Sequence, residues 1–389
     1  MTLGLIDVIG IFTFIQLSLL AVVAYRYNKG RALSNRLLAS FMASNALLIA
    51  QFLIGRAGWG LHNRTLILMS TGNSMYFLMM PLLFLYLRSL CYKDFRLRLA
   101  HLLHALPCVF VTLLFCVSVS VGEEGIPAMH VSRAGIGAFE FWSHKLIFNI
   151  QVLSYIVASV LLLSAYRKQI KNLYSSVESI DLSWCNLLLA GFATMWLIDF
   201  AAWVLGLLGW NREPLSSSLI VASLLVNLAL TLAVAYKGLL QGGSFSGILT
   251  PPKYAASTLQ AEECGALLDR LAKCMSDERP YLKPSLTIDE LARKLDVSAK
   301  HLSQAIHTRL DQSFYDFINA RRIADAKERL QQDTDRSQTI LAVAYDVGFN
   351  SKSVFNAAFK KHAGMTPKEF RRRRREPFPA ESPVAEQSD

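Results

Sequence analysis

Apolar residues gather into long runs over the first 240 residues of this 389-residue chain. A helix needs roughly 20 such residues to cross the hydrocarbon layer of a bilayer. Seven runs of about that length lie at residues 4–25, 34–54, 65–87, 99–121, 144–166, 185–209 and 216–236. The third run contains Pro81, which a helix inside a bundle tolerates. The pattern therefore predicts a seven-helix transmembrane bundle in residues 1–240.

Lys and Arg are shared unequally between the connectors of this bundle. If the N-terminus lies outside, the inner connectors hold twelve Lys and Arg residues and the outer connectors five. An excess of these residues marks the cytoplasmic side. We therefore expect a multi-pass protein in contact with the lipid of the bacterial inner (cytoplasmic) membrane, with its N-terminus outside and residue 237 in the cytoplasm.

The hydrophobic pattern changes in residues 241–284. Residues 238–257 are rich in Gly, Ser and Pro and indicate a flexible connector. Apolar residues then recur at positions 264, 267, 268, 271, 274 and 275, which is the spacing of one helical face over residues 258–275. Such a helix either docks on the domain that follows it or pairs with a second copy to form a homodimer.

Two helix-turn-helix patterns follow within residues 285–375. In the later one, a short apolar helix breaks at Gly348 and a second helix starts at Ser351, a suitable N-cap. The residue that links two steeply crossed helices often adopts positive φ, which glycine does without strain. The earlier pattern repeats this spacing with Asp296 at the turn and Ser298 at the cap. Asp visits positive φ more readily than most residues.

A helix predicted over residues 314–331 joins the two patterns, which we call the first reader (residues 286–311) and the second reader (residues 340–364). A rigid connector fixes the distance between two such units. Both can then enter successive major-groove segments on one face of DNA, about 34 Å apart.

The second reader and the residues after it carry a dense set of spaced residues. They are Ala344, Val347, Gly348, Phe349, Ser353, Phe355, Phe359, Lys360, Lys361, Gly364, Thr366, Pro367, Phe370 and Arg371. This set resembles the C-terminal signature of the AraC/XylS family of transcription regulators, and the resemblance extends upstream to Leu286. It implies an all-α domain with two helix-turn-helix units, and promoter DNA and RNA polymerase as partners. Asp311 departs from the family pattern, which usually has Gly before the connector helix.

Candidate base-reading residues follow from the family pattern and from side-chain chemistry. Gln304 and Asn356 suit adenine, whereas Lys300 and Lys352 suit guanine. The full predicted set is Lys300, Ser303, Gln304 and His307 in the first reader, and Lys352, Ser353 and Asn356 in the second.

Charge supports contact with DNA phosphates. Residues 285–375 hold 18 Lys and Arg against 11 Asp and Glu, and such a surface binds phosphates by counterion release. We assign Lys360, Lys361, Arg371 and Arg372 to phosphate contacts, with anionic lipid as an alternative target of the Arg run. Residues 376–389 are predicted to be disordered.

Polar residues inside the predicted spans are candidates for signal sensing. Asp199 is a carboxylate within a span, and intramembrane charges are costly and often functional. Asn149 and Asn227 could converge with Asp199 on a cavity for a small-molecule or membrane signal. The same side chains equally suit hydrogen bonds that hold helices together.

The combined prediction is an all-α, membrane-anchored, one-component transcription regulator. The sequence contains no Walker loop, receiver pattern, zinc motif or nucleophile constellation, so we expect neither an enzyme nor a metal or cofactor. One alternative is a membrane-stored factor that is released by cleavage in the linker. Another is a transporter or membrane enzyme with an appended regulator domain, which would need more buried carboxylates than Asp199.

Overall fold

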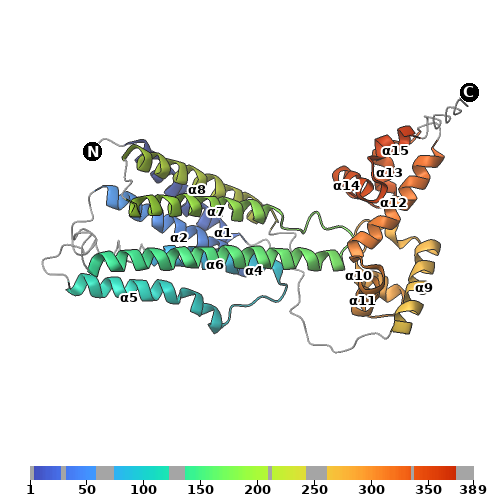
Figure 1. The fold of residues 1–389 in the computed structure, drawn as a ribbon, viewed down its shortest axis with the longest axis horizontal. Helices are drawn as coiled ribbons and strands as arrows, with labels where there is room; N and C mark the ends of the chain where they lie inside the picture. Colours follow the sequence, from blue (N-terminus) through green and yellow to red (C-terminus); the bar gives the residue numbers. More distant parts are fainter. Residues whose placement is uncertain are drawn as a thin grey trace, which may run out of the picture. The chain divides into compact units, whose positions relative to one another are not determined.

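The computed structural model describes residues 4–27, 32–57, 74–121, 136–208, 213–241, 261–333 and 337–373. These residues form helices and no extended strand, in agreement with the all-α prediction (Figure 1). The chain divides into a first unit, Met1–Tyr166 with Leu182–Lys253, and a second unit, Arg167–Asp181 with Tyr254–Asp389. Most of the predicted connector and the whole predicted tail, residues 242–260 and 376–389, lie outside the described residues.

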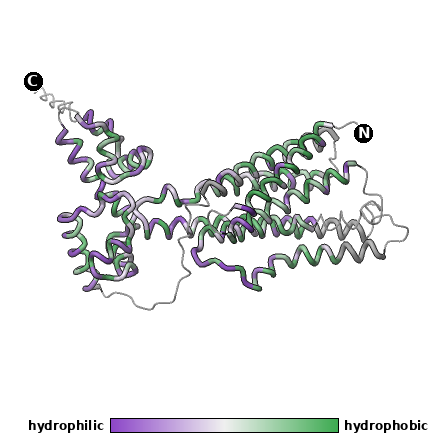
Figure 2. Tube along the Cα trace, turned by 180° about the vertical axis from the view of Figure 1, so that it is seen from behind, coloured by the Kyte–Doolittle hydropathy of each residue, from purple (hydrophilic) through white to green (hydrophobic). Residues whose placement is uncertain are grey.

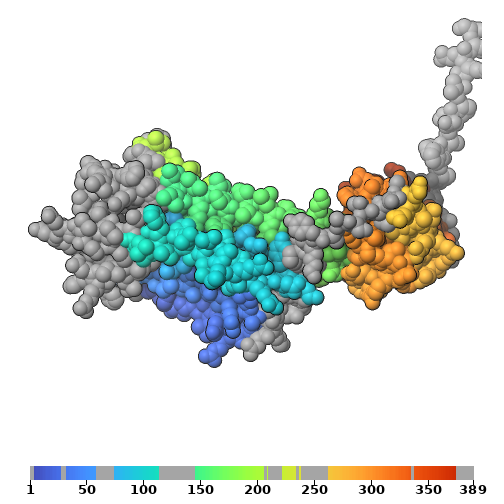
Figure 3. Space-filling model, turned by 90° about the horizontal axis from the view of Figure 1, so that it is seen from below, coloured from blue at the N-terminus to red at the C-terminus, as the bar shows by residue number. Residues whose placement is uncertain are grey.

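The first unit is a set of helices. They are α1 (Leu5–Arg26), α2 (Ala32–Arg56), α4 (Tyr76–Cys91), the 3-10 helix η2 (Leu99–Ala105), α5 (Leu106–Val121), α6 (Ile136–Leu173), α7 (Trp184–Leu207) and α8 (Glu213–Gln241). Helix α1 packs along α2 and α8, α2 packs on α4, and α7 packs on α8. Helices α5 and α6 run side by side along one face of this unit (Figures 1 and 3).

Interior contacts of the first unit combine aromatic packing with a few hydrogen bonds. The Phe77 and Phe148 rings of α4 and α6 meet edge to face with centroids 5.7 Å apart. Buried Ser89 donates from its hydroxyl to the Ser34 hydroxyl at 2.9 Å, which joins α4 to α2. Such interhelical contacts hold apolar helices together where water is absent.

Apolar side chains cover the outside of this unit. On α1, Leu5, Phe12 and Leu19 are 70%, 61% and 62% exposed. Hydrophobic residues dominate the helices of the first unit, whereas hydrophilic and hydrophobic residues alternate in the second (Figure 2). An apolar surface of this extent marks an interaction with lipid or with another apolar partner.

Four of the described helices are long and apolar enough to cross a membrane. These are Leu5–Arg26, Ala32–Arg56, Lys145–Leu173 and Trp184–Leu205. Shorter apolar helices, Tyr76–Cys91, Leu99–Leu113 and Val221–Ala233, coincide with the other three predicted spans. Residues 65–73 of the third predicted span lie outside the described residues. The structure therefore supports four membrane-capable helices, and the count of seven stays a prediction.

The second unit consists of shorter amphipathic helices. They are α9 (Ala261–Asp277), the 3-10 helix η4 (Pro280–Leu282), α10 (Ile288–Lys294), α11 (Ala299–Leu310), α12 (Phe314–Gln332), α13 (Ile340–Asp346), α14 (Lys352–Ala363) and α15 (Pro367–Arg373). Helix α12 matches the predicted connector helix within one residue at its C-terminal end. Its Ser313 N-cap hydroxyl accepts from the Asp316 N–H at 3.1 Å.

Two separate hydrophobic cores stabilise the second unit. The first core joins α9, α10, α11 and the start of α12, and the second joins the rest of α12 to α13 and α14. Helix α9 contributes buried Cys264, Leu267 and Leu271 to the first core. It therefore docks on the domain that follows it, the first of the two uses predicted for it, and shares a core with the first reader.

Candidate nucleic-acid interface

The first reader is α10, a tight turn and α11. The Thr287 hydroxyl accepts from the Glu290 N–H at 3.3 Å, and the Glu290 carboxylate accepts from the Thr287 N–H, which closes a capping box around the start of α10. Asp296 has φ +50°, as the turn requires. The Ser298 hydroxyl accepts from the His301 N–H at 3.1 Å and caps α11. The predicted turn and cap are therefore confirmed.

The second reader is α13, a tight turn and α14. Gly348 has φ +93°. A Cβ atom on Gly348 would lie 2.7 Å from the Tyr281 carbonyl oxygen and 2.8 Å from that of Leu282, so glycine is required for both conformation and space. Ser351 occupies the N-cap position of α14, but its hydroxyl pairs with the Ser353 hydroxyl at 2.7 Å and makes no side-chain capping bond. The expected cap hydrogen bond is therefore absent.

A chain of aromatic rings supports α14. Phe349, Phe355, Phe359 and Phe370 meet edge to face in succession, with centroids 5.3, 5.6 and 5.4 Å apart. Edge-to-face pairs add to the stabilisation that comes from burial. These rings hold α14 at a fixed position against α15 and leave its opposite face in solvent.

The predicted base-reading residues lie on the outward faces of α11 and α14. Lys300, His307, Lys352 and Ser353 are exposed, and Ser303, Gln304 and Asn356 are half-buried. Each helix buries its other face, with Leu302 and Ile306 in the first core and Phe355 and Phe359 in the second. The structure therefore presents all seven side chains away from the cores, and their contact with bases stays a prediction.

The four predicted phosphate contacts fall into two groups. Lys360 and Arg372 are exposed. The Arg371 guanidinium instead pairs with the Asp333 carboxylate at 3.1 Å, with only 13% and 8% of the two side chains exposed. This ion pair fixes α15 to the end of α12, so Arg371 has a structural partner that its place in the Arg run does not reveal.

Lys361 also has an acidic partner. Its ammonium lies 2.6 Å from the Asp316 carboxylate on α12. Burial acts to raise the pKa of Asp316, but hydrogen bonds from Lys361 and Ser313 outweigh it, so the pKa lies below its ordinary value. The pair links α14 to the connector helix, and the Lys361 side chain remains 60% exposed.

The structure joins two of the three candidate sensing residues through partners that were not predicted. The Lys145 ammonium lies 2.7 Å from the Asp199 carboxylate. One turn along α6 from Lys145, the Asn149 side-chain oxygen accepts from the Trp196 indole N–H at 2.9 Å. The side-chain oxygen of Asn227 is buried without a hydrogen-bond partner among the described residues. Its convergence with Asp199 on one cavity stays a prediction.

Comparison with known proteins identifies the second unit. Residues 291–373 match the family model described as "Helix-turn-helix domain". The chain is 31% identical over 86 residues to the probable transcription factor PqrA of Proteus vulgaris. The matched region is 22% of this chain and 68% of that protein. The chain belongs to the AraC family of transcription regulators.

This AraC-family chain is also similar to a larger regulator. It is 33% identical over 98 residues to the melibiose operon regulatory protein of Escherichia coli strain K12, over 24% of this chain and 32% of that protein. It thus spans about a third of the length of that relative. The solved C-terminal domain of AraT, a response regulator from Geobacillus stearothermophilus, is 25% identical over 34% of this chain and 95% of that chain, with a TM-score of 0.24.

Proposed function

We propose that this chain is a membrane-anchored, one-component transcription regulator, in which one polypeptide both receives a signal and binds promoter DNA. One observation carries the proposal. The same chain holds two helix-turn-helix units matched by the family model and four helices apolar enough to cross a membrane. A regulator of this design needs no separate sensor protein to carry the signal.

DNA recognition uses the outward faces of α11 and α14. Lys300, Ser303, Gln304 and His307 contact bases from the first helix, and Lys352, Ser353 and Asn356 contact bases from the second. Helix α12 sets the spacing, so that the two helices enter neighbouring major-groove segments. Lys360, exposed on α14, and Arg372, exposed on α15, contact phosphates and contribute affinity without sequence preference.

Membrane anchoring places the second unit beside the inner face of the cytoplasmic membrane. The outward apolar surface of α1 supports contact with lipid hydrocarbon. The Lys and Arg excess in the inner connectors supports an N-terminus outside and a cytoplasmic second unit.

This orientation is tested with reporter fusions at residue 260. A reporter active only in the cytoplasm is expected to function there, and one active only in the periplasm is expected to stay silent. The reverse result contradicts the proposed orientation.

Signal sensing involves the polar residues within the helices of the first unit. The ion pair of Lys145 with Asp199 and the nearby Asn149 to Trp196 hydrogen bond bring polar groups from α6 and α7 together. Asn227 offers a buried oxygen without a described partner. A small-molecule or membrane signal that competes for these groups would change how α6 packs on α7.

The decisive experiment measures binding of the full-length protein, in lipid nanodiscs, to promoter fragments of varied sequence and at varied salt. Asn356→Ala is expected to cost about 1 to 3 kcal/mol at one base position and to relax preference there. Lys360→Ala is the matched control, because loss of a phosphate contact weakens all sequences alike and lowers the salt slope by about one. An unchanged base preference in Asn356→Ala contradicts the proposed role of α14.

A further inference from the structure

The connection between α6 and α7 reaches into the second unit. Residues 167–181 belong to that unit, although they precede the rest of it by more than seventy positions in the sequence. Leu173 packs against the first core. The Ser175 N–H donates to the Leu286 carbonyl at 3.1 Å, and Tyr174 forms an isolated antiparallel bridge with Thr287, the N-cap of α10. We call residues 171–178 the docking segment.

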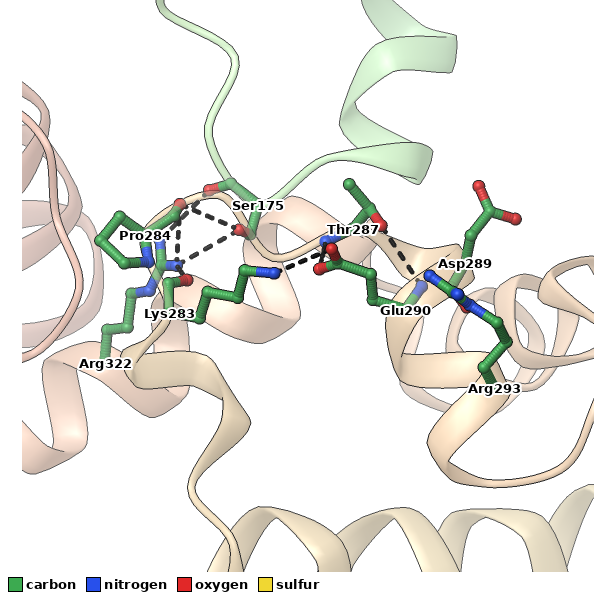
Figure 4. Close-up of polar contacts among 8 residues, drawn as sticks. All are labelled: Ser175, Lys283, Pro284, Thr287, Asp289, Glu290, Arg293 and Arg322. Carbon is green, nitrogen blue, oxygen red and sulfur yellow. Dashed lines mark hydrogen bonds and ion pairs between the residues drawn. The ribbon is translucent and has the colours of Figure 1, made fainter.

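Arg322 on α12 forms the socket for this segment (Figure 4). Its side chain is 1% exposed. The guanidinium donates to the Ser175 carbonyl at 3.3 Å, to the Ser175 hydroxyl at 3.2 Å, and to the carbonyls of Tyr281 and Lys283 at 2.7 and 2.8 Å. A buried guanidinium must have its N–H groups satisfied, and the docking segment supplies two of the acceptors.

Arg322 keeps its charge in this socket. Burial lowers its pKa to about 10, and the nearby Glu178 carboxylate opposes that shift. The guanidinium is therefore protonated at neutral pH, and its hydrogen bonds to the docking segment are charge-assisted, the stronger class of hydrogen bond.

The other side of the docking segment touches the second reader. The Asn350 side chain donates to the Ser176 hydroxyl at 3.2 Å. Asn350 directly precedes Ser351, the N-cap position of α14. The Lys171 ammonium lies 5.9 Å from the centre of the Tyr315 ring on α12. The docking segment therefore contacts the first reader, the connector helix and the second reader together.

These contacts lie where the two readers meet. Each reader has its own core, and Leu282 packs partly on both. Gly348 of the second reader approaches the Tyr281 and Leu282 carbonyls, and Arg322 lies between Ile318 of the first core and Ile323 of the second in the sequence of α12. A segment bound at this junction restrains the orientation of one reader relative to the other.

We propose that the docking segment is an intramolecular ligand that clamps the two readers in the orientation needed to bind both DNA segments at once. Its two ends continue into α6 and α7, so a signal that shifts these helices releases or engages the clamp. The proposal rests on the proposed function, because it assigns a route from signal to DNA. It also makes a separate claim, that residues 171–178 bind the readers, which is measurable without DNA.

Docking is tested first by cross-linking in the full-length protein in nanodiscs. The double variant Ser176→Cys with Asn350→Cys is expected to be joined by a short bifunctional thiol reagent, because the two side chains are in hydrogen-bond contact. Peptide mass spectrometry identifies the link, and the two single variants are the controls. Failure of the double variant to link, or equal linking to native cysteines in the single variants, overturns the docking.

Hydrogen exchange supplies a second test of docking. The Ser175 amide is expected to be protected in the wild-type protein. Ser175→Pro, which removes this donor to Leu286, is expected to deprotect the neighbouring amides of residues 174 and 176. The milder Ser176→Ala removes the hydroxyl that accepts from Asn350 and donates to Glu178. Ser179→Ala, at an exposed position of the same connection, is its matched control. Unprotected exchange of the Ser175 amide in the wild type overturns the docking.

The clamp is tested on promoter fragments with two recognition segments or with one. Ser175→Pro is expected to lower affinity for the two-segment fragment by about three- to tenfold, the range of a hydrogen bond's net contribution, and to leave one-segment binding unchanged. Ser176→Ala should show a smaller loss, and Ser179→Ala none. If Ser175→Pro binds the two-segment fragment as tightly as the wild type does, the clamp is overturned. If the wild type binds neither fragment, the proposed function and the clamp's role in DNA binding both fail. The cross-linking experiment still shows whether residues 171–178 bind the readers.

Discussion

The two readers share one spacing of residues but reach the same shape by different means. The first reader turns at Asp296 with φ +50° and caps α11 with the Ser298 hydroxyl. The second turns at Gly348 with φ +93° and lacks a side-chain cap on α14 among the described contacts. The helix-turn-helix spacing thus sets where the chain turns, while the neighbours of each turn decide which residue is tolerated there.

Support for the two readers also differs. The first core takes α9 and Leu173 from outside the helix-turn-helix pattern. The second core relies on aromatic rings of its own helices and of α15, with Phe355 at the centre of the succession. The first reader is therefore stabilised partly by distant segments of the chain, and the second by its own helices and by α12 and α15, which flank it in the sequence.

Phe355→Ala is the substitution expected to separate the two cores most clearly. Removing a fully buried ring costs about 3 to 5 kcal/mol, and Phe355 contacts rings on both sides of it. Native-state hydrogen exchange of the full-length protein should show lost protection in α13 to α15 and retained protection in α9 to α11. An equal loss of protection in both sets of helices would show that the cores are one cooperative unit.

Gly348→Ala is expected to destabilise the second reader by about 2 to 4 kcal/mol, because positive φ and the crowded Cβ position both disfavour a side chain. Asp296→Gly, the matched change at the first turn, should alter stability by less than about 1 kcal/mol. Chemical denaturation followed by exchange protection of each reader measures the two effects. Similar losses of stability from Gly348→Ala and Asp296→Gly would show that the two turns do not differ in the residue they require.

Ser298→Ala should cost about 1 kcal/mol, because it removes an N-cap hydrogen bond. Ser351→Ala should cost only a few tenths of that amount, since its hydroxyl bonds to Ser353 instead of the helix backbone. The exchange rates of the first-turn amides of α11 and α14 report each cap separately. A larger loss in Ser351→Ala would show that its hydroxyl caps α14 in solution.

The pair of Lys361 with Asp316 predicts a small acid sensitivity. Because the folded pKa of Asp316 lies below its unfolded value, the contribution is fully present above about pH 4 and is lost as pH falls through the folded pKa. The pair is largely exposed at Lys361, so the effect should stay below about 1 kcal/mol. This contribution is measured as the difference in free energy of unfolding between the wild type and Lys361→Met at neutral and at acidic pH. A difference that stays constant with pH would exclude the predicted acid sensitivity of the pair.

Local sequence signals predicted most of the reading domain. The turn at Gly348 and the apolar spacing of the connector helix are decided within a few residues, so periodicity and backbone preference place them correctly. The same holds for α9, whose buried Leu267 and Leu271 lie on the face that the spacing indicated. Residue type and spacing also predicted that Asn356 and Lys300 lie on outward faces. They do so because the opposite faces of α14 and α11 are buried in the two cores.

Contacts between distant residues could not be predicted in the same way. Ser175 binds Leu286 and Arg322 largely through backbone groups, and backbone groups carry no signature in the sequence. Arg371 lies in a run of arginines that indicates phosphate binding, and only the fold brings Asp333 to it. Lys145 lies at one end of the predicted span 144–166, and only the fold brings its ammonium to the Asp199 carboxylate on α7.

The buried guanidinium of Arg322 has a practical consequence for anyone who wishes to study the reading domain as a soluble fragment. A version that starts after the last apolar helix lacks Ser175 and leaves two of the arginine's hydrogen bonds without acceptors, at a cost of about 1 to 3 kcal/mol. Grafting residues 171–178 back through a short flexible tether restores those acceptors. A tethered fragment is therefore the better starting material for crystallisation.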